Sequence, residues 1–258
     1  MKESLHNNEF GSTVPPDILK GYRTHASRTM MFGELELLLE AVPAEGSPQD
    51  YGRAVLEENA LLKGAATTRA KSLRHLRELY ALDGEETLFG ALRMLWDYDP
   101  PSRPLLVALA AVTRDGLLRS TAPLIVETQA GSPVNAEMLS GAVAASFPDL
   151  LAPGILAKVG RNTTSSWTQS GHLEGRFNKV RVRVRPSVGA VVYALFLGHL
   201  SGIRGLPLYE TLWARLLDAP EHELDALAFA ASQRGWMEYR RMGEVAEFGF
   251  SRLEGVRG

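Results

Sequence analysis

The sequence predicts a mainly α-helical protein: a helical bundle with a helix-turn-helix-like module and a C-terminal winged-helix-like unit that ends in a short β-hairpin. Three observations predict this fold class. Apolar residues recur at three- and four-residue spacing almost without interruption from Ser27 onward. Prolines between positions 100 and 133 separate the helical stretches. Near the C-terminus, one more helical stretch is followed by two β-like runs, 236–240 and 244–250.

The first half of the chain contains a helix-turn-helix-like segment at residues 47–81. Ser47 followed by Pro48 predicts a helix start, because a hydroxyl caps the helix and proline has no N–H to leave unpaired there. That helix runs to about residue 59. A second helix begins near Thr67 or Thr68, whose hydroxyls can cap it. Its predicted buried stripe consists of Ala70, Leu73, Leu76 and Tyr80.

Further helices are predicted by the same spacing along the rest of the chain. They cover residues 85–97, 103–114, 134–146, 153–169, 188–202 and 208–217. Asp218 and Glu221 have the spacing of a capping box for one more helix, which Gly235 is placed to end.

The length of 258 residues predicts about two domains. Residues 1–27 are polar and lack a helical period, which predicts a flexible or loosely docked lead-in. Residues 28–150 form the predicted helical domain, and residues 151–258 form the C-terminal domain. The boundary between them falls between about residues 120 and 175.

Composition excludes several classes of protein. The net charge of -2 excludes a uniformly basic nucleic-acid coat, although local basic patches remain compatible with it. Cysteine is absent, which excludes disulfides, thiolate metal sites and a thiol nucleophile. The uncharged stretch 186–203 contains glycines and a histidine that shorten its apolar run, so a buried core helix is predicted and not a membrane span. A soluble, cytoplasmic protein is therefore expected.

Motifs for catalysis and cofactor binding are missing from the sequence. The six histidines lack metal-ligand spacing, and no phosphate-binding loop, dinucleotide-binding glycine motif or serine nucleophile motif is present. Asp149 and Glu174-x-Arg176 only faintly resemble a nuclease core, and the lysine that would complete it is missing. We therefore expect no enzyme activity, no catalytic residues, no metal and no cofactor.

The first candidate binding surface is the second helix of the 47–81 segment. Hydroxyl and basic side chains at the start of a helix that docks by one apolar stripe are typical of a recognition helix. An ordinary solvent-exposed helix face would carry the same residue types. The predicted DNA-binding residues of this helix are Thr67, Thr68, Arg69, Lys71 and Arg74.

The second candidate surface is the segment 158–185, where seven Lys and Arg residues and one Glu give +6 in a chain of net charge -2. Alternation of Val180, Val182 and Val184 with arginines predicts a strand with one basic face, or an extended arm. Arginine, hydroxyl and amide groups are the donors that phosphate contacts use. The predicted DNA-binding residues here are Lys158, Arg161, Asn162, Thr163, Thr164, Ser165, Trp167, Arg176, Lys179, Arg181 and Arg183.

Two alternatives remain open for this second segment. Trp167 can instead be a core residue whose indole N–H is satisfied inside the protein. The basic strand can instead pair with acidic helices, because the rest of the chain sums to about -8.

The winged-helix-like end is the third candidate. Its helix begins with Glu221, Glu223 and Asp225, which complement the helix dipole but would repel phosphate. Arg240 and Arg241 lie in the hairpin and could touch a DNA backbone. We interpret this unit as structural or partner-binding.

Four segments resemble the BrxA family of bacterial BREX phage-defence systems. They are SRTMM leading into ELELLLEAV, LLKGAATTRAKSLRHLRELYAL (61–82), NTTSSWTQSGHLEG (162–175) followed by KVRVRVRP, and ASQRGWMEYRRMGEVAEFGF (231–250). The resemblance covers roughly residues 27–250, and the Trp-Thr-Gln-Ser-Gly-His segment is its most specific part.

The resemblance implies a small, non-enzymatic, largely helical DNA-binding protein, encoded beside the methyltransferase, ATPase and alkaline-phosphatase-like components of the system. The chain departs from the family at 64–66, where a more basic turn would be expected. Double-stranded DNA is therefore the expected partner, bound mainly through phosphates with weak sequence preference, with other BREX components as further partners. The alternative is a scaffold whose basic strand docks an acidic protein of the same complex.

Overall fold

A computed structural model of the chain describes residues 19–82 and 87–255. The first half contains η1 (Thr24–Ala26), α1 (Phe32–Ala41), α2 (Pro48–Leu56), α3 (Ala66–Tyr80), α4 (Thr87–Tyr98), η2 (Pro100–Ser102), α5 (Arg103–Arg114), α6 (Gly116–Arg119), α7 (Ala122–Glu127) and α8 (Ala136–Ser146). The second half contains α9 (Pro153–Gln169), β1 (Leu173–Glu174), β2 (Val180–Arg181), α10 (Val188–Leu200), η3 (Leu206–Glu210), α11 (Leu212–Arg215), α12 (Glu221–Gln233), β3 (Glu238–Met242), β4 (Val245–Gly249) and α13 (Ser251–Glu254). The described chain is mainly helical with a small antiparallel hairpin near its C-terminal end, which confirms the predicted fold class.

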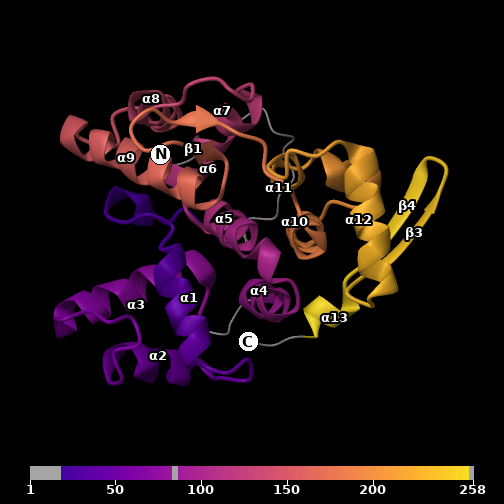
Figure 1. Cartoon of the computed structure of the whole chain (residues 1–258), viewed down its shortest axis with the longest axis horizontal. Coiled ribbons are helices and arrows are strands. Elements are labelled where there is room, and N and C mark those ends of the chain that lie inside the picture. The colour runs from indigo at the N-terminus through magenta and orange to yellow at the C-terminus, as the bar shows by residue number, and fades with distance from the viewer. Residues whose placement is uncertain (1–18, 83–86, 256–258) are drawn as a thin grey trace, which may run out of the picture.

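Three groups of helices surround a central layer (Figure 1). Helices α4, α5 and α10 lie in the middle. On one side, α1 to α3 and the α8–α9 pair project from this layer, and on the other side α12 packs against the β3–β4 hairpin. The larger of two hydrophobic clusters among the described residues runs from Met30 to Leu253 and includes residues of both predicted domains. The smaller cluster consists of Leu117, Val143 and Val159.

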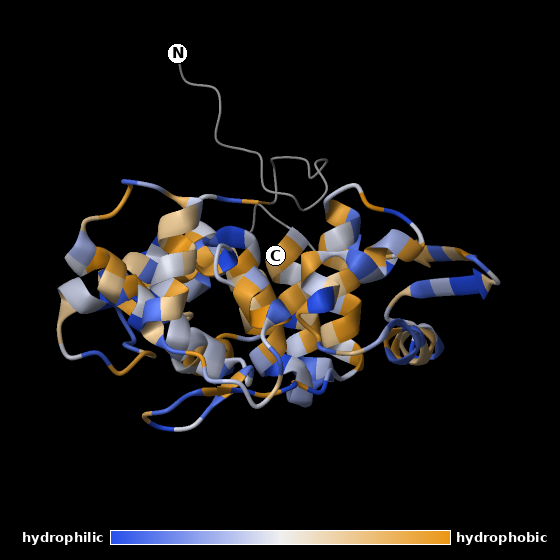
Figure 2. Cartoon of the chain, turned by 90° about the horizontal axis from the view of Figure 1, so that it is seen from above, coloured by the Kyte–Doolittle hydropathy of each residue, from blue (hydrophilic) through white to orange (hydrophobic). Residues whose placement is uncertain are grey.

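Helix α10 is the centre of this core. Every residue from Val188 to Gly198 is buried, and the helix packs against α4, α5 and α12. Figure 2 shows hydrophobic helices gathered in the middle of the molecule. The predicted core helix in the uncharged stretch is confirmed. Within residues 19–82 and 87–255, no helix has the length and apolar character that crossing a bilayer requires.

A buried carboxylate caps α10. Asp99 Oδ2 accepts a hydrogen bond of 2.6 Å from the backbone N–H of Gly189, in the first turn of the helix. A negative charge there complements the helix dipole. A Cβ atom at Gly189 would lie 2.9 Å from Asp99 Oδ2 and 3.0 Å from Ser102 Oγ. Glycine therefore lets the cap approach the backbone closely.

The start of α2 follows the prediction, and the start of α3 differs from it. Ser47 and Asp50 form a capping box with Pro48 in the first turn. Helix α3 begins at Ala66 without a side-chain cap, so the predicted caps from Thr67 or Thr68 are wrong. A side chain of α3 stabilises the connection between α2 and α3: Arg69 donates to the carbonyls of Leu56 (3.1 Å) and Lys63 (3.3 Å).

The last part of the predicted lead-in is docked. Residues 1–18 lie outside the described residues. The backbone N–H groups of Lys20 and Tyr22 donate to the carbonyls of Thr113 and Arg114 at the end of α5. Residues 20–27 are therefore part of the folded body and not a flexible lead-in.

The C-terminal unit has the predicted order of a helix followed by a hairpin. The side chain of Asp225 on α12 accepts hydrogen bonds from Tyr239 and Arg241 of β3. Arg241 also pairs with Glu221 at 3.0 Å. These bonds fix the hairpin to the helix and occupy one of the two hairpin arginines.

Candidate nucleic-acid interface

The η1 turn lies between α3 and α9 and joins the two segments that the sequence marked as separate candidates (Figure 1). On the α3 side, Thr24 Oγ1 donates to Glu78 Oε2 (2.8 Å), and Ser27 Oγ lies 3.3 Å from His75 Nε2. On the α9 side, Asn162 Nδ2 donates to the His25 carbonyl at 2.8 Å. The structure therefore places the two helices on either side of one short turn.

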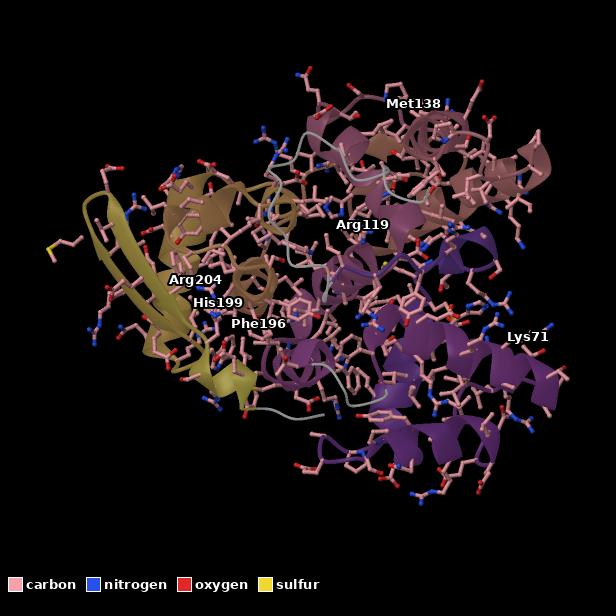
Figure 3. The ribbon with its side chains drawn as sticks, turned by 180° about the vertical axis from the view of Figure 1, so that it is seen from behind. Lys71, Arg119, Met138, Phe196, His199 and Arg204 are labelled. Atoms are coloured by element: carbon pink, nitrogen blue, oxygen red, sulfur yellow. The ribbon has the colours of Figure 1, made fainter. Side chains whose placement is uncertain are left out.

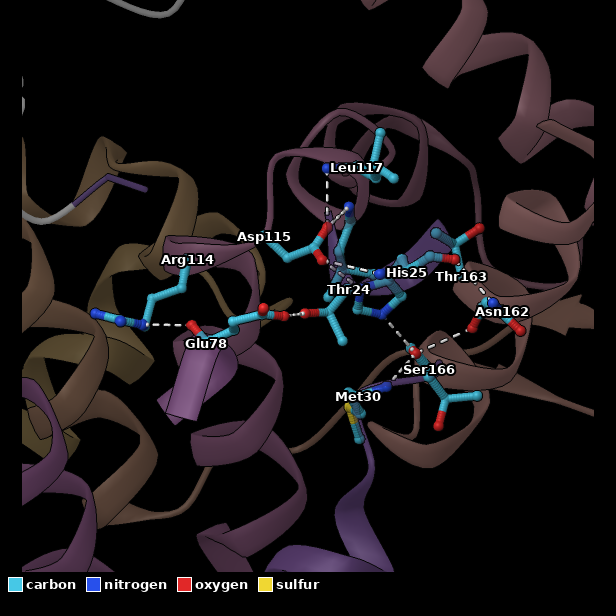
Figure 4. A network of polar contacts seen from close by, with 12 residues as sticks. Thr24, His25, Met30, Glu78, Arg114, Asp115, Leu117, Asn162, Thr163 and Ser166 are labelled. Atoms are coloured by element: carbon cyan, nitrogen blue, oxygen red, sulfur yellow. Dashed lines mark hydrogen bonds and ion pairs between the residues drawn. The ribbon is translucent and has the colours of Figure 1, made fainter. Parts of the chain in front are cut away.

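A buried polar network connects η1 to the start of α6 and to α9 (Figure 4). His25 Nδ1 lies 3.1 Å from Asp115 Oδ2, and His25 Nε2 lies 2.9 Å from Ser166 Oγ. Asp115 also caps α6 by accepting from the N–H groups of Leu117 and Leu118, both at 2.9 Å. Burial raises the pKa of the Asp115 carboxyl, but the charge of His25 and the backbone hydrogen bonds outweigh it and lower the pKa overall. The carboxylate is thus held as an anion.

The order Asp115–His25–Ser166 has the connectivity of a nucleophile with its general base. All three side chains are buried. Ser166 Oγ already accepts from the Met30 N–H (2.8 Å) and donates to the Asn162 carbonyl (3.0 Å). Through these contacts Ser166 connects η1 and the segment after it to α9. Its hydroxyl is not accessible to a substrate in this conformation.

Helix geometry directs basic side chains toward η1 from both sides. Lys71 lies four residues before His75 on α3, and Lys158 lies four residues before Asn162 on α9, so each shares the η1-facing side of its helix. Arg74 Nη2 lies 3.3 Å from His75 Nε2. Lys71, Arg74 and Lys158 are exposed, and Lys71 stands at the edge of the molecule (Figure 3).

Arg23 and Arg28 flank η1 and belong to the same basic surface as Lys71, Arg74 and Lys158. The sequence did not predict that these two arginines are part of a binding surface. Arg28 Nη1 donates to the Ser27 carbonyl at 3.4 Å, next to the contact between Ser27 and His75. The sequence does show two arginines five residues apart, but nothing in it places them beside α3 and α9. We call the resulting surface the η1 face; it consists of Arg23, Arg28, Lys71, Arg74, Lys158 and Arg161.

The charge of the η1 face is strongly positive. Its six basic residues are accompanied by one acidic residue, Glu78. Arg69 and Arg77 of α3 are not counted, because Arg69 donates to the carbonyls of Leu56 and Lys63 and Arg77 lies against Gly52 of α2. Glu78 is itself engaged by Thr24, Arg74 and His75. The local balance is therefore +5, in a chain whose total is -2.

The remaining predicted residues of the two helices divide by exposure. Thr67 and Arg161 are exposed; Thr68, Arg69, Asn162, Thr164 and Ser165 are half-buried. Thr163 and Trp167 are buried, so the prediction that they contact DNA is wrong for this conformation. Thr163 Oγ1 donates to the Val159 carbonyl (2.9 Å), as hydroxyls on the inner side of a helix often do. Trp167 Nε1 donates to Thr121 Oγ1 at 2.8 Å, so the core alternative for this residue is the correct one.

The predicted basic strand face is also only partly present. The β2 strand covers Val180 and Arg181 alone, and Arg181 is 2% exposed. Its guanidinium donates to the Ile125 carbonyl (2.7 Å) and forms an ion pair with Asp218. Arg181 is therefore a core residue and the prediction that it binds DNA is wrong. Arg176 and Arg183 are exposed, and Lys179 is half-buried.

Asp218, the partner of Arg181, does not have the capping role that the sequence predicted for it. Asp218 does not cap α12, whose N-cap is Pro220. It adopts a left-handed backbone conformation (φ 55°), and its carboxylate accepts from Arg181 and from the Val184 N–H at 3.0 Å. The alternative that the basic strand pairs with acidic helices holds only in part: Arg181 does pair with an acidic residue of the same chain, but Asp218 lies in the turn before α12 and not in a helix.

Among the described residues, no cluster of His, Asp and Glu has the arrangement to hold a metal ion. No family model, no curated protein and no solved structure matches this chain. The case for function therefore depends on the geometry and charge of the η1 face.

Proposed function

We propose that the protein binds double-stranded DNA through the η1 face, mainly by contacts to phosphates and with weak sequence preference. The observation that carries the proposal is the presence of six basic residues and one acidic residue on the η1 face, which draws on three segments that η1 brings together. Lys and Arg at a duplex neutralise phosphates and release counterions. Hydroxyl groups beside them, such as that of the exposed Thr67, supply the shorter contacts that fix register.

The biological part of the proposal rests on the resemblance to the BrxA family. On that basis the protein is a non-enzymatic accessory of a BREX phage-defence system, acting in the cytoplasm on DNA beside the other components. In a host that carries the system, a strain lacking this gene should lose protection against phage, and a Lys71→Glu/Lys158→Glu gene should fail to restore it. A plasmid incubated with the protein and Mg²⁺ should stay intact; nicking would contradict the non-enzymatic part.

The binding test is a salt titration of fluorescence anisotropy with a labelled duplex. Wild-type affinity should fall steeply between about 50 and 200 mM salt, since the logarithm of the binding constant falls by about 0.9 per neutralised phosphate for each log unit of salt. Lys71→Glu and Lys158→Glu should each weaken binding at every salt concentration and reduce the slope by about 1.

Arg240→Glu is the matched control, because it makes the same change of charge at an exposed position on the distant β3 strand. An equal loss for all three variants would indicate a diffuse charge effect and contradict the η1 face. Loss of duplex affinity only in Arg240→Glu would indicate that the β3–β4 hairpin, and not the η1 face, binds DNA.

The alternative of a protein scaffold has less support than in the sequence alone, because the Arg181 side chain is buried and is not on the surface that would dock an acidic partner. Arg183 and Arg185 remain exposed and could still meet an acidic protein. Absence of duplex binding at low salt, together with capture of an acidic component of the same system that Arg183→Glu abolishes, would favour this alternative.

A further inference from the structure

The β1–β2 hairpin carries an exposed aromatic side chain at its tip. Phe177 is 85% exposed, although it lies in a turn between two paired strands. The Arg176 guanidinium lies over its ring, 5.1 Å from the ring centroid. Large apolar side chains are normally buried because water contact with them is unfavourable. A phenylalanine held out on a hairpin tip therefore needs a reason.

The hairpin tip is tightly built. Gly175 has a φ of 100°, which only glycine adopts readily, and a Cβ atom there would lie 2.2 Å from the Asn178 carbonyl oxygen. Lys179 Nζ donates back to the Gly175 carbonyl. The backbone on the other side of β2 is tied as well, since Gly131 donates to the Arg181 carbonyl at 2.7 Å. Phe177 is thus presented by a fixed turn.

One hydrogen bond and one close packing contact link the base of this hairpin to the middle of α9 through the start of α8. The Val134 N–H donates to the Lys179 carbonyl at 3.0 Å, and two residues later α8 begins at Ala136. The Ala136 carbonyl packs so closely on Gly160 of α9 that a Cβ there would lie 2.2 Å away. Arg161 of the η1 face follows Gly160 directly. Figure 1 shows β1 beside α9 in the same part of the molecule.

The charge around Phe177 favours a nucleic acid over an apolar protein surface. From 174 to 185 the chain has the basic residues Arg176, Lys179, Arg183 and Arg185 against Glu174 alone, with Arg181 left out because it is buried and paired with Asp218. Asn178, which follows Phe177 in the sequence, is exposed and offers an amide for base edges. Proteins that bend duplexes combine such cationic and amide groups with one apolar wedge that enters between base pairs from the minor groove.

We propose that Phe177 is such a wedge: it inserts between two base pairs of the duplex from the minor groove, with Arg176 and Asn178 contacting the groove beside it. The proposal depends on the proposed function, because it assigns a binding mode to the same ligand. Insertion unstacks one step and kinks the duplex, and this favours flexible pyrimidine–purine steps over stiff A-tracts. Weak sequence preference would then follow from deformability and not from base readout.

The test uses duplexes with 2-aminopurine at a central TA or CA step, whose fluorescence rises on unstacking, and donor and acceptor dyes at the ends to report bending. Wild-type protein at saturation should raise 2-aminopurine fluorescence and shorten the end-to-end distance. Phe177→Ala should abolish both signals and weaken binding about fivefold or more, as expected for the loss of one aromatic–base stack. Phe177→Trp should retain the signals.

Met242→Ala is the control, since Met242 is 84% exposed at the tip of the other hairpin. It should leave both signals unchanged. Wild-type binding without unstacking or bending would overturn the wedge and leave the proposed function standing, as would unstacking that persists in Phe177→Ala. Absence of any duplex binding at low salt would instead overturn the proposed function, and the wedge with it. Circular dichroism of Phe177→Ala should match that of the wild type, because the replaced side chain is 85% exposed.

Discussion

Arg181 and Asp218 form an ion pair whose side chains are only 2% and 9% exposed, although they lie 37 positions apart in the sequence. The pair joins the extended segment after α9 to the turn before α12. The same carboxylate accepts from the Val184 backbone, and the same guanidinium donates to the Ile125 carbonyl. A residue that looks like part of a basic surface is therefore a link between the two halves of the fold.

Breaking this pair should destabilise the protein strongly. Asp218→Asn leaves the Arg181 guanidinium buried with an uncompensated charge, which typically costs about 3–5 kcal/mol. We expect a clear drop in Tm and in the urea midpoint. Glu210→Gln removes one negative charge at an exposed position and serves as the control, with a change within about 0.5 kcal/mol. Equal Tm values for the two variants would contradict a structural role for the pair.

The same pair shows why only part of the candidate site was predictable. Periodicity alone gave α5 and α9 with their exact bounds, because apolar stripes and flanking prolines are local signals. Whether Arg181 faces solvent depends on Asp218, and alternation along a strand carries no information about a distant partner. The proximity of α3 and α9 likewise depends on buried contacts of η1, such as His25 with Ser166, between residues 141 positions apart.

Trp167 should matter for stability and not for DNA binding. Trp167→Phe removes the indole N–H and leaves the buried Thr121 hydroxyl without that donor, at a cost of about 1–3 kcal/mol. Urea denaturation should show this loss. The variant's duplex affinity and salt slope, measured well below its Tm, should equal those of the wild type. A duplex affinity clearly below that of the wild type, with the fold intact at the temperature of the measurement, would contradict the purely structural role of Trp167.

His172 should make the stability depend on pH. Burial lowers its pKa to about 4 from an ordinary value of 6.5. Nε2 lies 2.8 Å from the Leu216 carbonyl, which can only accept, so the neutral ring carries its proton there. Protonation adds a second proton, at Nδ1. Because the folded state binds that second proton less tightly than the unfolded state, the stability contributed by the neutral ring is fully present above pH 6.5. Stability falls as the pH drops from 6.5 toward 4, by about 3 kcal/mol in total.

Thermal denaturation at intervals between pH 4 and pH 8 measures this dependence. His172→Gln can still donate one hydrogen bond but does not titrate, so its Tm should change less over the same range. A wild-type Tm that stays constant from pH 6.5 to pH 4.5, or an equal slope in the variant, would contradict the assignment.

Gly189 is required by the cap of α10. In Gly189→Ala the new methyl group would lie 2.9 Å from Asp99 Oδ2 and 3.0 Å from Ser102 Oγ. Overpacking of this kind costs about 1–3 kcal/mol. Gly141→Ala is a matched control, because this glycine of α8 has open space around its Cβ position. Alanine should stabilise that helix by about 0.5–1 kcal/mol, so the Tm of the two variants should move in opposite directions.

Asn162 should act on DNA binding through position and not through charge. Its amide holds the His25 carbonyl at 2.8 Å, and thereby fixes η1 with Arg23 and Arg28 against α9. Asn162→Ala frees the turn without removing a cation. We expect weaker duplex binding with an unchanged salt slope, since the number of neutralised phosphates stays the same once the complex forms. Lys158→Glu, one turn away, should weaken binding and also lower the slope by about 1. A lower slope in Asn162→Ala would mean that fewer cations of the η1 face reach phosphates once the turn is released. Unchanged affinity would mean that the hydrogen bond from Asn162 to η1 is not needed for binding.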